Sequence, residues 1–217
     1  THRHSSAASD VYKRQDITVA ETPHLEWPQN TLHRYHHIIS CQRKILNFPY
    51  VFYMDVDMRV VSEVGEEVLP SREKPFVGVA HPGYFANQTP ELPYGTPESN
   101  ENSQAYYDPE ELKPFCYYAG GVQGGLSPQF LSACHALTLT IDLDKNNGIT
   151  AKYNDESHWN KYLATYNSHV NTLAPIYCFP ENAKSNYDLE PKIITLAKNE
   201  KWTDISRMQE SLPSLWG

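Results

Sequence analysis

The chain has 217 residues, of which 40% are hydrophobic and 20% charged, and its formal net charge is -8. This length suffices for one sizeable core, with a single domain as the default, and no segment is long and apolar enough to span a membrane. The acidic balance argues against nucleic acid as the main partner, because a polyphosphate backbone would be repelled. A nucleotide stays possible, since a metal and a few basic side chains can supply local positive charge.

The first part of the chain gives little structural signal. Residues 1–15 are mostly small and polar, and Asp10–Gln15 resembles the translation of a sequencing-library adapter. We therefore expect a non-native or disordered leader at residues 1–15, followed by one domain at residues 16–217. Asp16–Ala20 predicts a short strand, and the apolar spacing from about Thr31 to Asn47 predicts a helix.

An aromatic and β-branched run follows, Tyr50–Met54, and it leads into Asp55 and Asp57. Such a run predicts a buried strand, and alternation would point both carboxylates to one side if the strand continued through them. In α/β sheets the carboxyl ends of the strands are where ligands bind. Two carboxylates held there repel each other, so a hard divalent cation shared with a phosphorylated substrate is their natural partner.

The rest of the chain alternates strands and helices, which predicts an α/β fold. Strands are expected at Phe76–Ala80, Cys116–Val122, Leu173–Phe179 and Ile193–Leu196, and helices at Ser127 to about Asp142 and Asp155–Tyr166. Residues 86–114 carry little periodicity and predict a long loop, which in a compact domain is usually functional or disordered. Gly120 and Gly121 are expected to break their strand.

Two further clusters carry chemistry. In Asn154–Tyr162 the acids Asp155 and Glu156 lie at a probable helix start, where they either cap the helix or aim a carboxylate into a cleft. In Tyr117–Gly125 four glycines within six residues either kink the strand or let backbone approach a ligand closely. No phosphate-binding loop fits, because no Lys-Ser/Thr follows these glycines.

The cysteines suggest no metal or redox motif. Their spacings match neither a zinc knuckle nor a redox pair. We expect reduced, mostly buried thiols at Cys41, Cys116, Cys134 and Cys178.

In their order and spacing these clusters resemble glycosyltransferase family 6, which includes the blood-group A and B transferases and α-1,3-galactosyltransferase. The resemblance runs from near Ile17 to about Lys198. The matching motifs are Asp55–Met58, His81–Gly83, Ser103–Tyr106, Tyr117–Gly121, Ala133–His135, Asn147–Ile149 and Asp155–Tyr162. The resemblance implies a glycosyltransferase-A (Rossmann-like) fold with a mixed central sheet. It also implies retaining α-1,3 transfer of galactose or N-acetylgalactosamine from a UDP donor.

The resemblance assigns roles on the donor side. Asp57 matches a direct Mn²⁺ ligand, and Asp55 matches a ligand or a ribose contact. The expected cofactor is Mn²⁺ or another divalent cation. Glu156 matches the catalytic glutamate, as nucleophile or as stabiliser of an oxocarbenium-like centre. Arg34 and Asp155 match contacts to the donor sugar, and Lys198 matches a lysine for the diphosphate.

Specificity is implied by two further sets of residues. The tripeptide Ala119, Gly120 and Gly121 matches the donor-selecting position, where glycine leaves room for an acetamido group and so favours N-acetylgalactosamine over galactose. On the acceptor side the matches are His81, Thr96 and Tyr153, and the expected acceptor is a galactoside or fucosylated galactoside.

Two alternatives stay open at this point. Phosphatases of the haloacid-dehalogenase type also place Asp-x-Asp after a strand, with Asp55 then the nucleophile, but they expect Thr or Val where this chain has Arg59. The other alternative is a non-catalytic nucleotide-sugar-binding domain, which requires Glu156 to be dispensable.

The family's domain begins with two strands and a helix before the segment at Ile17. We therefore expect a sheet that lacks its first strands and exposes an edge. The chain by itself is expected to be poorly soluble, to bind UDP weakly and to be nearly inactive. Its composition is closer to bacterial or phage members, which implies a cytoplasmic location.

Overall fold

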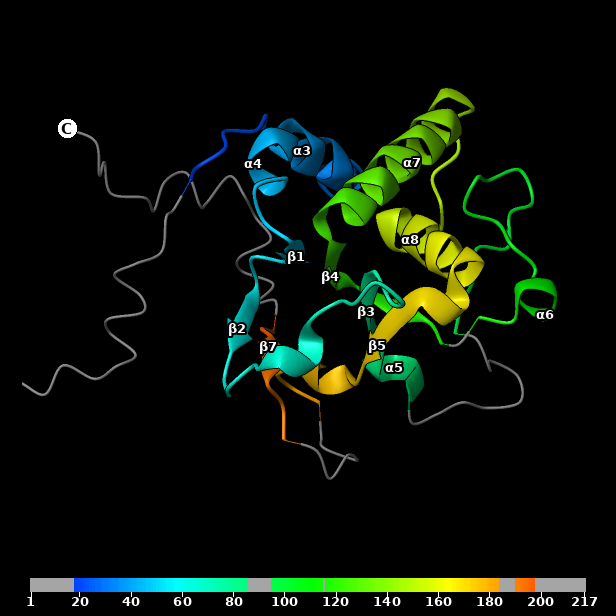
Figure 1. Ribbon diagram of the computed structural model, residues 1–217. Coiled ribbons are helices and arrows are strands. Elements are labelled where there is room, and N and C mark those ends of the chain that lie inside the picture. The colour runs from blue at the N-terminus through cyan, green and yellow to red at the C-terminus, as the bar shows by residue number, and fades with distance from the viewer. Residues whose placement is uncertain (1–17, 86–94, 115, 184–189, 198–217) are drawn as a thin grey trace, which may run out of the picture.

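The computed structural model describes residues 18–85, 95–114, 116–183 and 190–197. Within them, a central four-stranded sheet has helices on one face and a smaller three-stranded sheet on the other (Figure 1). This arrangement confirms the expected mixed α/β class. The expected leader at residues 1–15 and Lys198 lie outside the described residues.

The strands of the central sheet follow the order β1-β4-β3-β5, and those of the smaller sheet the order β2-β7-β6. Their bounds are β1 (Tyr50–Met54), β2 (Met58–Val60), β3 (Phe76–Ala80), β4 (Tyr118–Leu126), β5 (Val170–Leu173), β6 (Phe179–Pro180) and β7 (Ile193–Thr195). The helices are α2 (Gln29–Leu32), α3 (Arg34–Ser40), α4 (Gln42–Ile45), α5 (Pro82–Phe85), α6 (Pro109–Leu112), α7 (Ser127–Asn146) and α8 (Asn154–Thr165). Short 3₁₀ turns are η1 (Glu66–Val68), η2 (Asn167–His169) and η3 (Pro175–Tyr177).

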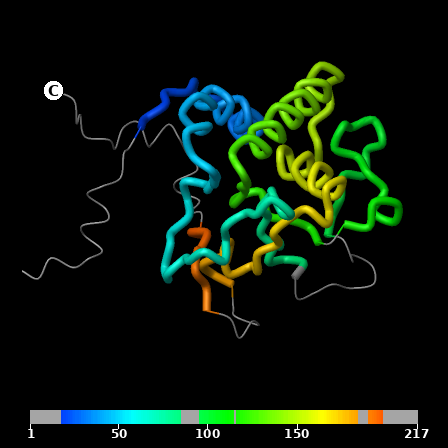
Figure 2. Tube along the Cα trace, in the orientation of Figure 1, coloured from blue at the N-terminus to red at the C-terminus, as the bar shows by residue number. Residues whose placement is uncertain are grey.

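Two apolar clusters lie on opposite faces of the central sheet. Phe76 of β3 belongs to the cluster under α3, α7 and α8, whereas Val77 and Val79 belong to the cluster facing β7 and η3. This alternation follows from the period of two in a strand. All five residues of β3 are therefore buried, as expected for a strand covered on both faces. Figure 2 shows how the early helices (blue) come to lie beside α7, far along the chain.

Strand β4 runs antiparallel to both β1 and β3, and β3 runs parallel to β5. The strand does not end at Gly120 and Gly121, since β4 continues through them to Leu126. The predicted break is instead an irregularity in its pairing with β3, whose register shifts between Gln123 and Tyr118. Gly124 and Gly125, later in the strand, let neighbouring segments approach β4 closely. A Cβ on Gly124 would lie 2.7 Å from Phe52 Cδ1, and one on Gly125 would collide with the Pro75 carbonyl.

The helix predicted for Thr31–Asn47 is divided into α2, α3 and α4. The breaks fall at His33 and Cys41, whose φ and ψ are −87° and 1°, and −95° and 4°. At His33 the ring Nδ1 lies 2.8 Å from the Gln29 carbonyl oxygen and so competes for a helical acceptor. Two of the other helix predictions are confirmed, since α7 runs one turn beyond Asp142 and α8 ends at Thr165.

The prediction of a strand at Leu173–Phe179 is wrong. Strand β5 ends at Leu173, and Pro175, which has no N–H to donate, begins the 3₁₀ turn η3. Residues 18–20 form no strand, and the first two residues of the predicted Asp16–Ala20 strand lie outside the described residues. The strand predicted for Ile193–Leu196 is confirmed as β7.

Within the described residues, β1 forms one edge of the central sheet, bonded only to β4. The prediction that this strand is buried is wrong, because Tyr50, Phe52 and Met54 are exposed and the two residues between them only partly buried. Hollows of about 390 and 720 Å³ lie between this edge and the helices α3 and α4. The expectation of an exposed apolar edge is met in this part of the chain.

All four cysteines are unpaired, as expected. Cys134 and Cys178 are buried, while Cys41 and Cys116 are half-buried. Burial raises the pKa of Cys134 to about 12 and that of Cys178 to about 11. These thiols are therefore poor nucleophiles at neutral pH.

Over the ranges that the structure describes, no helix combines the length and the apolar character needed to cross a bilayer.

Gly78 offers a test of the packing between the central sheet and α8. A Cβ there would lie 2.5 Å from Tyr118 Cδ1 and 3.0 Å from Leu163 Cδ1. We expect Gly78→Ala to lower the free energy of unfolding by about 1–3 kcal/mol, because the core must shift to admit the methyl group. Urea denaturation followed by circular dichroism measures the change.

Gly65→Ala is the matched control. The three atoms nearest to a Cβ at Gly65 all belong to the exposed Glu67 side chain. Moving that side chain disturbs its surface contacts with Lys192 and Tyr177, which are worth little. Its unfolding midpoint should stay close to wild type. Equal loss of stability in both variants would contradict this account of the sheet–helix packing.

Candidate functional site

The Asp55–Asp57 acid pair lies immediately after the last residue of β1. The Asp55 N–H still donates to the Gly121 carbonyl at 3.0 Å, and the chain then turns, with Val56 fully exposed at the turn. The pair therefore stands at the carboxyl end of a strand, as the sequence predicted, although the strand does not continue through it. The Leu196 N–H donates to the Asp57 carbonyl at 2.8 Å, so the segment after β7 lies beside the pair.

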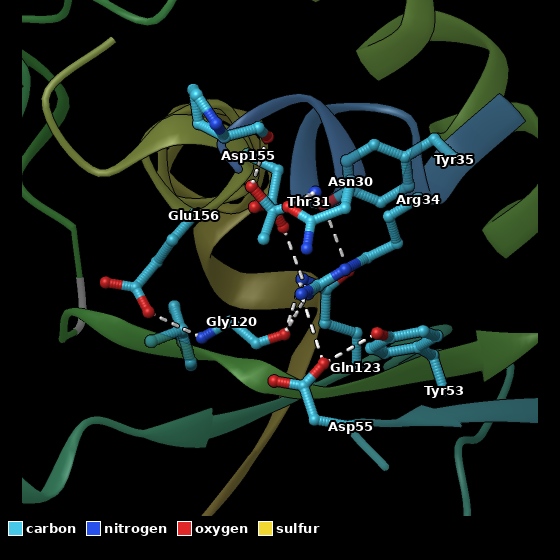
Figure 3. Close-up of polar contacts among 12 residues, drawn as sticks. Asn30, Thr31, Arg34, Tyr35, Tyr53, Asp55, Gly120, Gln123, Asp155 and Glu156 are labelled. Atoms are coloured by element: carbon cyan, nitrogen blue, oxygen red, sulfur yellow. Dashed lines mark hydrogen bonds and ion pairs between the residues drawn. The ribbon is translucent and has the colours of Figure 1, made fainter. Parts of the chain in front are cut away.

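Arg34, at the start of α3, is the centre of the site (Figure 3). Its side chain is buried, with Nη2 3.1 Å from Asp55 Oδ1 and Nη1 3.0 Å from Asp155 Oδ2. Nη1 also donates to the Gly120 carbonyl. One guanidinium thus joins α3 to β4, α8 and the residue after β1. A planar group with five N–H donors can make these contacts together, whereas the compact ammonium of a lysine cannot.

Tyr53 completes the surroundings of Arg34. The guanidinium carbon lies 4.4 Å from the centre of the Tyr53 ring, and the Tyr53 hydroxyl donates to Asp55 Oδ1 at 2.6 Å. Burial raises the pKa of Tyr53 above its ordinary value, so the hydroxyl stays a donor at neutral pH. Asp55 Oδ1 is thereby held by two donors.

The start of α8 presents its two acids in different directions. Asn154 adopts φ 50°, a left-handed conformation that Asn tolerates better than most residues. Asp155 points toward Arg34, whereas Glu156 Oε2 accepts the Gly120 N–H at 2.7 Å (Figure 3). Gly120 is therefore held on both sides, its carbonyl by Arg34 and its N–H by Glu156.

Burial raises the pKa of both acids at the start of α8. It raises the pKa of Glu156 to about 7, although the hydrogen bond from Gly120 opposes the shift. It raises the pKa of Asp155 to about 6, with the positive charge of Arg34 opposing. Perturbed carboxylates gathered at a strand end are typical of functional sites.

In the tripeptide Ala119–Gly121, predicted to select the donor, the two glycines lie against Glu156 and Asp55. A Cβ on Gly120 would stand 3.2 Å from Glu156 Oε2, so this position has little room for a side chain. At Gly121 a Cβ would collide with the terminal methyl of Met58 and stand 3.1 Å from Asp55 Oδ2. Ala119 is buried in the apolar cluster on the side of β7.

The residues predicted for the acceptor side gather around Tyr84, which sequence reasoning missed. The His81 and Tyr84 ring centres are 4.9 Å apart, and the Tyr84 hydroxyl lies 2.8 Å from Thr96 Oγ1. Burial raises the pKa of Tyr84, with Tyr153 and the Glu156 charge nearby also raising it. His81, Thr96 and Tyr153 are thus gathered around Tyr84, which the Glu156 charge also reaches.

Other contacts at the site were also not foreseen. Gln123, fully buried in β4, donates to the Gly120 carbonyl at 3.0 Å and accepts from the Tyr35 hydroxyl at 3.0 Å. The signal in the sequence was a polar residue inside a strand that is otherwise apolar or glycine. Beside the acid pair a pocket of about 270 Å³ is lined by Asn30, Thr31, Arg34, Tyr53, Asp55, Val56 and Asp57.

Comparison with known proteins identifies the family. The profile of glycosyltransferase family 6 matches residues 12–209. The chain belongs to this family. The histo-blood group ABO system transferase 1 of Rattus norvegicus is 32% identical over 173 residues, which is 77% of this chain and 46% of that protein.

Two relatives carry another name. The globoside alpha-1,3-N-acetylgalactosaminyltransferase 1 of Gallus gallus is 35% identical over 135 residues, 61% of this chain and 36% of that protein. Its counterpart in Homo sapiens is 30% identical over 163 residues, 73% of this chain and 43% of that protein. The chain therefore spans less than half the length of these curated relatives.

Removing the Arg34 side-chain charge tests the organisation of this site. We expect Arg34→Met to lower the free energy of unfolding by about 3 kcal/mol at pH 7.5, because it leaves Asp155 and Asp55 without their cation. Without the arginine the pKa of buried Asp155 rises further, so its ionisation destabilises the fold as pH increases. The variant should therefore lose less stability at pH 5 than at pH 7.5.

Urea denaturation at the two pH values measures this difference. Arg59→Met is the control. Arg59 is exposed, and its ion pair with Glu181, at 3.7 Å on the surface, contributes little to stability. An Arg34→Met variant as stable as the control at both pH values would refute the central role of Arg34.

Proposed function

We propose that the protein containing this chain is a retaining α-1,3-glycosyltransferase with a glycosyltransferase-A fold. It moves N-acetylgalactosamine, less readily galactose, from a UDP donor to a galactoside or fucosylated galactoside. The proposal is carried by one arrangement in a chain of family 6: Arg34 contacts Asp55, Asp155 and the Gly120 carbonyl, and Glu156 accepts the Gly120 N–H. Membership of this family leaves the phosphatase alternative without support.

The donor set of the acid pair fits a hard divalent cation such as Mn²⁺. Among the described residues no cluster of three or more His, Cys, Asp or Glu side chains could hold a metal. Asp55 and Asp57 would therefore supply the protein ligands, and phosphate oxygens and water the others, which is how cations of nucleotide sites are usually held. When bound, the cation supplies positive charge that stabilises a departing diphosphate.

The chain's own residues perform the remaining tasks. Arg34 and Asp155 orient the donor sugar by hydrogen bonds, and Lys198, which lies outside the described residues, contacts the diphosphate. Glu156 faces the sugar as a carboxylate, because only the ionised form can act as a nucleophile or stabilise a developing positive charge. Its hydrogen bond from the Gly120 N–H keeps one carboxylate oxygen fixed while the other is directed away from β4 (Figure 3).

The donor preference is proposed to arise at Gly121. The terminal methyl of Met58 lies where a Cβ at Gly121 would stand, next to Asp55 Oδ2. Glycine therefore leaves this place to a flexible side chain, which a substituent on the sugar can displace. A difference of this kind is worth about 1–3 kcal/mol in discrimination. His81, Thr96 and Tyr153 are proposed to form the acceptor side, with the half-exposed Tyr153 ring offering a flat face to a sugar.

The direct test is UDP release from the full-length protein with UDP-N-acetylgalactosamine or UDP-galactose as donor. We expect release in Mn²⁺, a several-fold preference for the N-acetylated donor, and loss of activity in excess chelator. Asp57→Asn should behave as chelator does, because it removes one of the two carboxylates.

Glu63→Gln, at an exposed position away from the site, controls for nonspecific effects of removing an acid. Full activity in chelator would refute the metal, and a preference for UDP-galactose would refute the donor. No release from either donor would refute the transferase proposal.

The pH dependence of the reaction tests the role of Glu156. Because its pKa is about 7, the reactive carboxylate is lost as pH falls through 7, and kcat/KM should decline about tenfold per pH unit. Below pH 6 the decline should steepen as Asp155 also becomes protonated. Initial rates between pH 5 and 9 define the profile.

Glu156→Gln should lower kcat by about 10²–10³-fold. It should also abolish the decline of kcat/KM between pH 7 and 6, because no carboxylate is left there to be protonated. Because burial raises the pKa of Glu156 from 4.5 to about 7, its ionisation costs stability as pH rises between these values. This variant should therefore unfold at higher urea than wild type at pH 8 but at nearly the same urea at pH 5. A variant that stays active with an unchanged profile would show that Glu156 is dispensable.

A further inference from the structure

Glu98 is a buried carboxylate outside the site described above. Only 5% of its surface is exposed. Its Oε1 accepts the Asn100 N–H at 2.8 Å, and its Oε2 accepts the Lys152 N–H. Within the described residues it forms no ion pair, so backbone N–H groups satisfy both of its oxygens. An ionised group desolvated in this way is tolerated only where its donors are held in place.

A second buried acid fixes the same loop farther along. Asp144 of α7 accepts the Gln104 N–H at 2.6 Å and the Ser103 hydroxyl at 2.5 Å. Lys161 of α8 donates to the Gln104 carbonyl at 2.8 Å. The loop after Gly95 is therefore attached at one point to the turn before α8 and at another to α7 and α8.

The first of these attachments joins two segments that carry acceptor-side residues. Thr96 precedes Glu98 by two positions, and its hydroxyl contacts Tyr84 at 2.8 Å. Tyr153 directly follows Lys152, and its N–H donates to Ser157 Oγ at 3.0 Å at the start of α8. The Glu98 carboxylate thus sets the separation between Thr96 and Tyr153.

We infer that Glu98 is a positioning residue for the acceptor: by holding the Lys152 N–H it keeps Tyr153 and Thr96 at the spacing that a galactoside requires. The inference rests on the proposed function. Glu98 contacts neither Arg34 nor the acid pair, so its loss should spare donor binding. The expected signature is a defect in transfer to the acceptor without an equal defect in donor hydrolysis.

The experiment compares Glu98→Ala and Glu98→Gln with Glu101→Gln in the full-length protein. Glu101 is exposed and three positions away, which makes it a matched control. Two rates are measured: transfer from UDP-N-acetylgalactosamine to a galactoside such as lactose, and hydrolysis of the donor without acceptor. Hydrogen exchange followed by mass spectrometry is measured on the same proteins over residues 150–153.

Glu98→Ala should raise the acceptor KM at least tenfold while donor hydrolysis stays within twofold of wild type. Glu98→Gln keeps the shape but loses the charge, and should raise the KM about threefold. Glu101→Gln should change neither rate. Exchange at residues 150–153 should be at least tenfold faster in Glu98→Ala and unchanged in Glu101→Gln.

Equal loss of transfer and hydrolysis, or an unchanged acceptor KM, would overturn the inference. If Glu98→Ala does not fold, the KM of Glu98→Gln decides the question by the same criteria. A wild-type protein that turns over no UDP-sugar would refute the proposed function instead. In that case faster exchange in the Glu98 variants would still establish the attachment, and unchanged exchange would refute it.

Discussion

The site depends on one buried guanidinium. Arg34 contacts carboxylates from β1 and α8 and the backbone of β4, three elements that are far apart in the sequence. Bringing Asp55 and Asp155 together without it would place two negative charges in a poorly solvated space. The arginine therefore makes the approach of α8 to the end of β1 energetically possible. Glu156, one residue beyond Asp155, reaches Gly120 because of that approach.

The glycines of β4 also allow α8 and the end of β1 to come close to one another. At Gly120 and Gly121 the side chains of Glu156, Met58 and Asp55 occupy the space that a Cβ would need. A strand with ordinary residues at these positions would keep α8 and the β1 end apart. The same lack of side chains lets the Gly120 N–H and carbonyl serve as donor and acceptor, so the backbone itself becomes part of the site.

Local sequence signals predicted the strands β1 and β3 and the helices α7 and α8, because apolar runs and flanking Pro or Ser mark strands and helix starts. They wrongly predicted that β1 is buried, since its exposure depends on which segment lies beside it. They did not predict the division of the early helix at His33 or the turn at Pro175, where single residues override the pattern. The acids of the site were visible as motifs, and resemblance alone connected them with Arg34. Tyr84, Gln123 and Glu98 were missed, since their importance comes from contacts between distant segments.

The distribution of the thiols has a practical consequence for spectroscopy. Cys134 and Cys178 are buried and their raised pKa values leave almost no thiolate at neutral pH, and burial raises the pKa of Cys116 to about 11 as well. Cys41 is half-buried and lines the hollow beside β1. A maleimide fluorophore would therefore attach first at Cys41, giving a reporter of whatever chain segment or molecule covers that edge of the sheet.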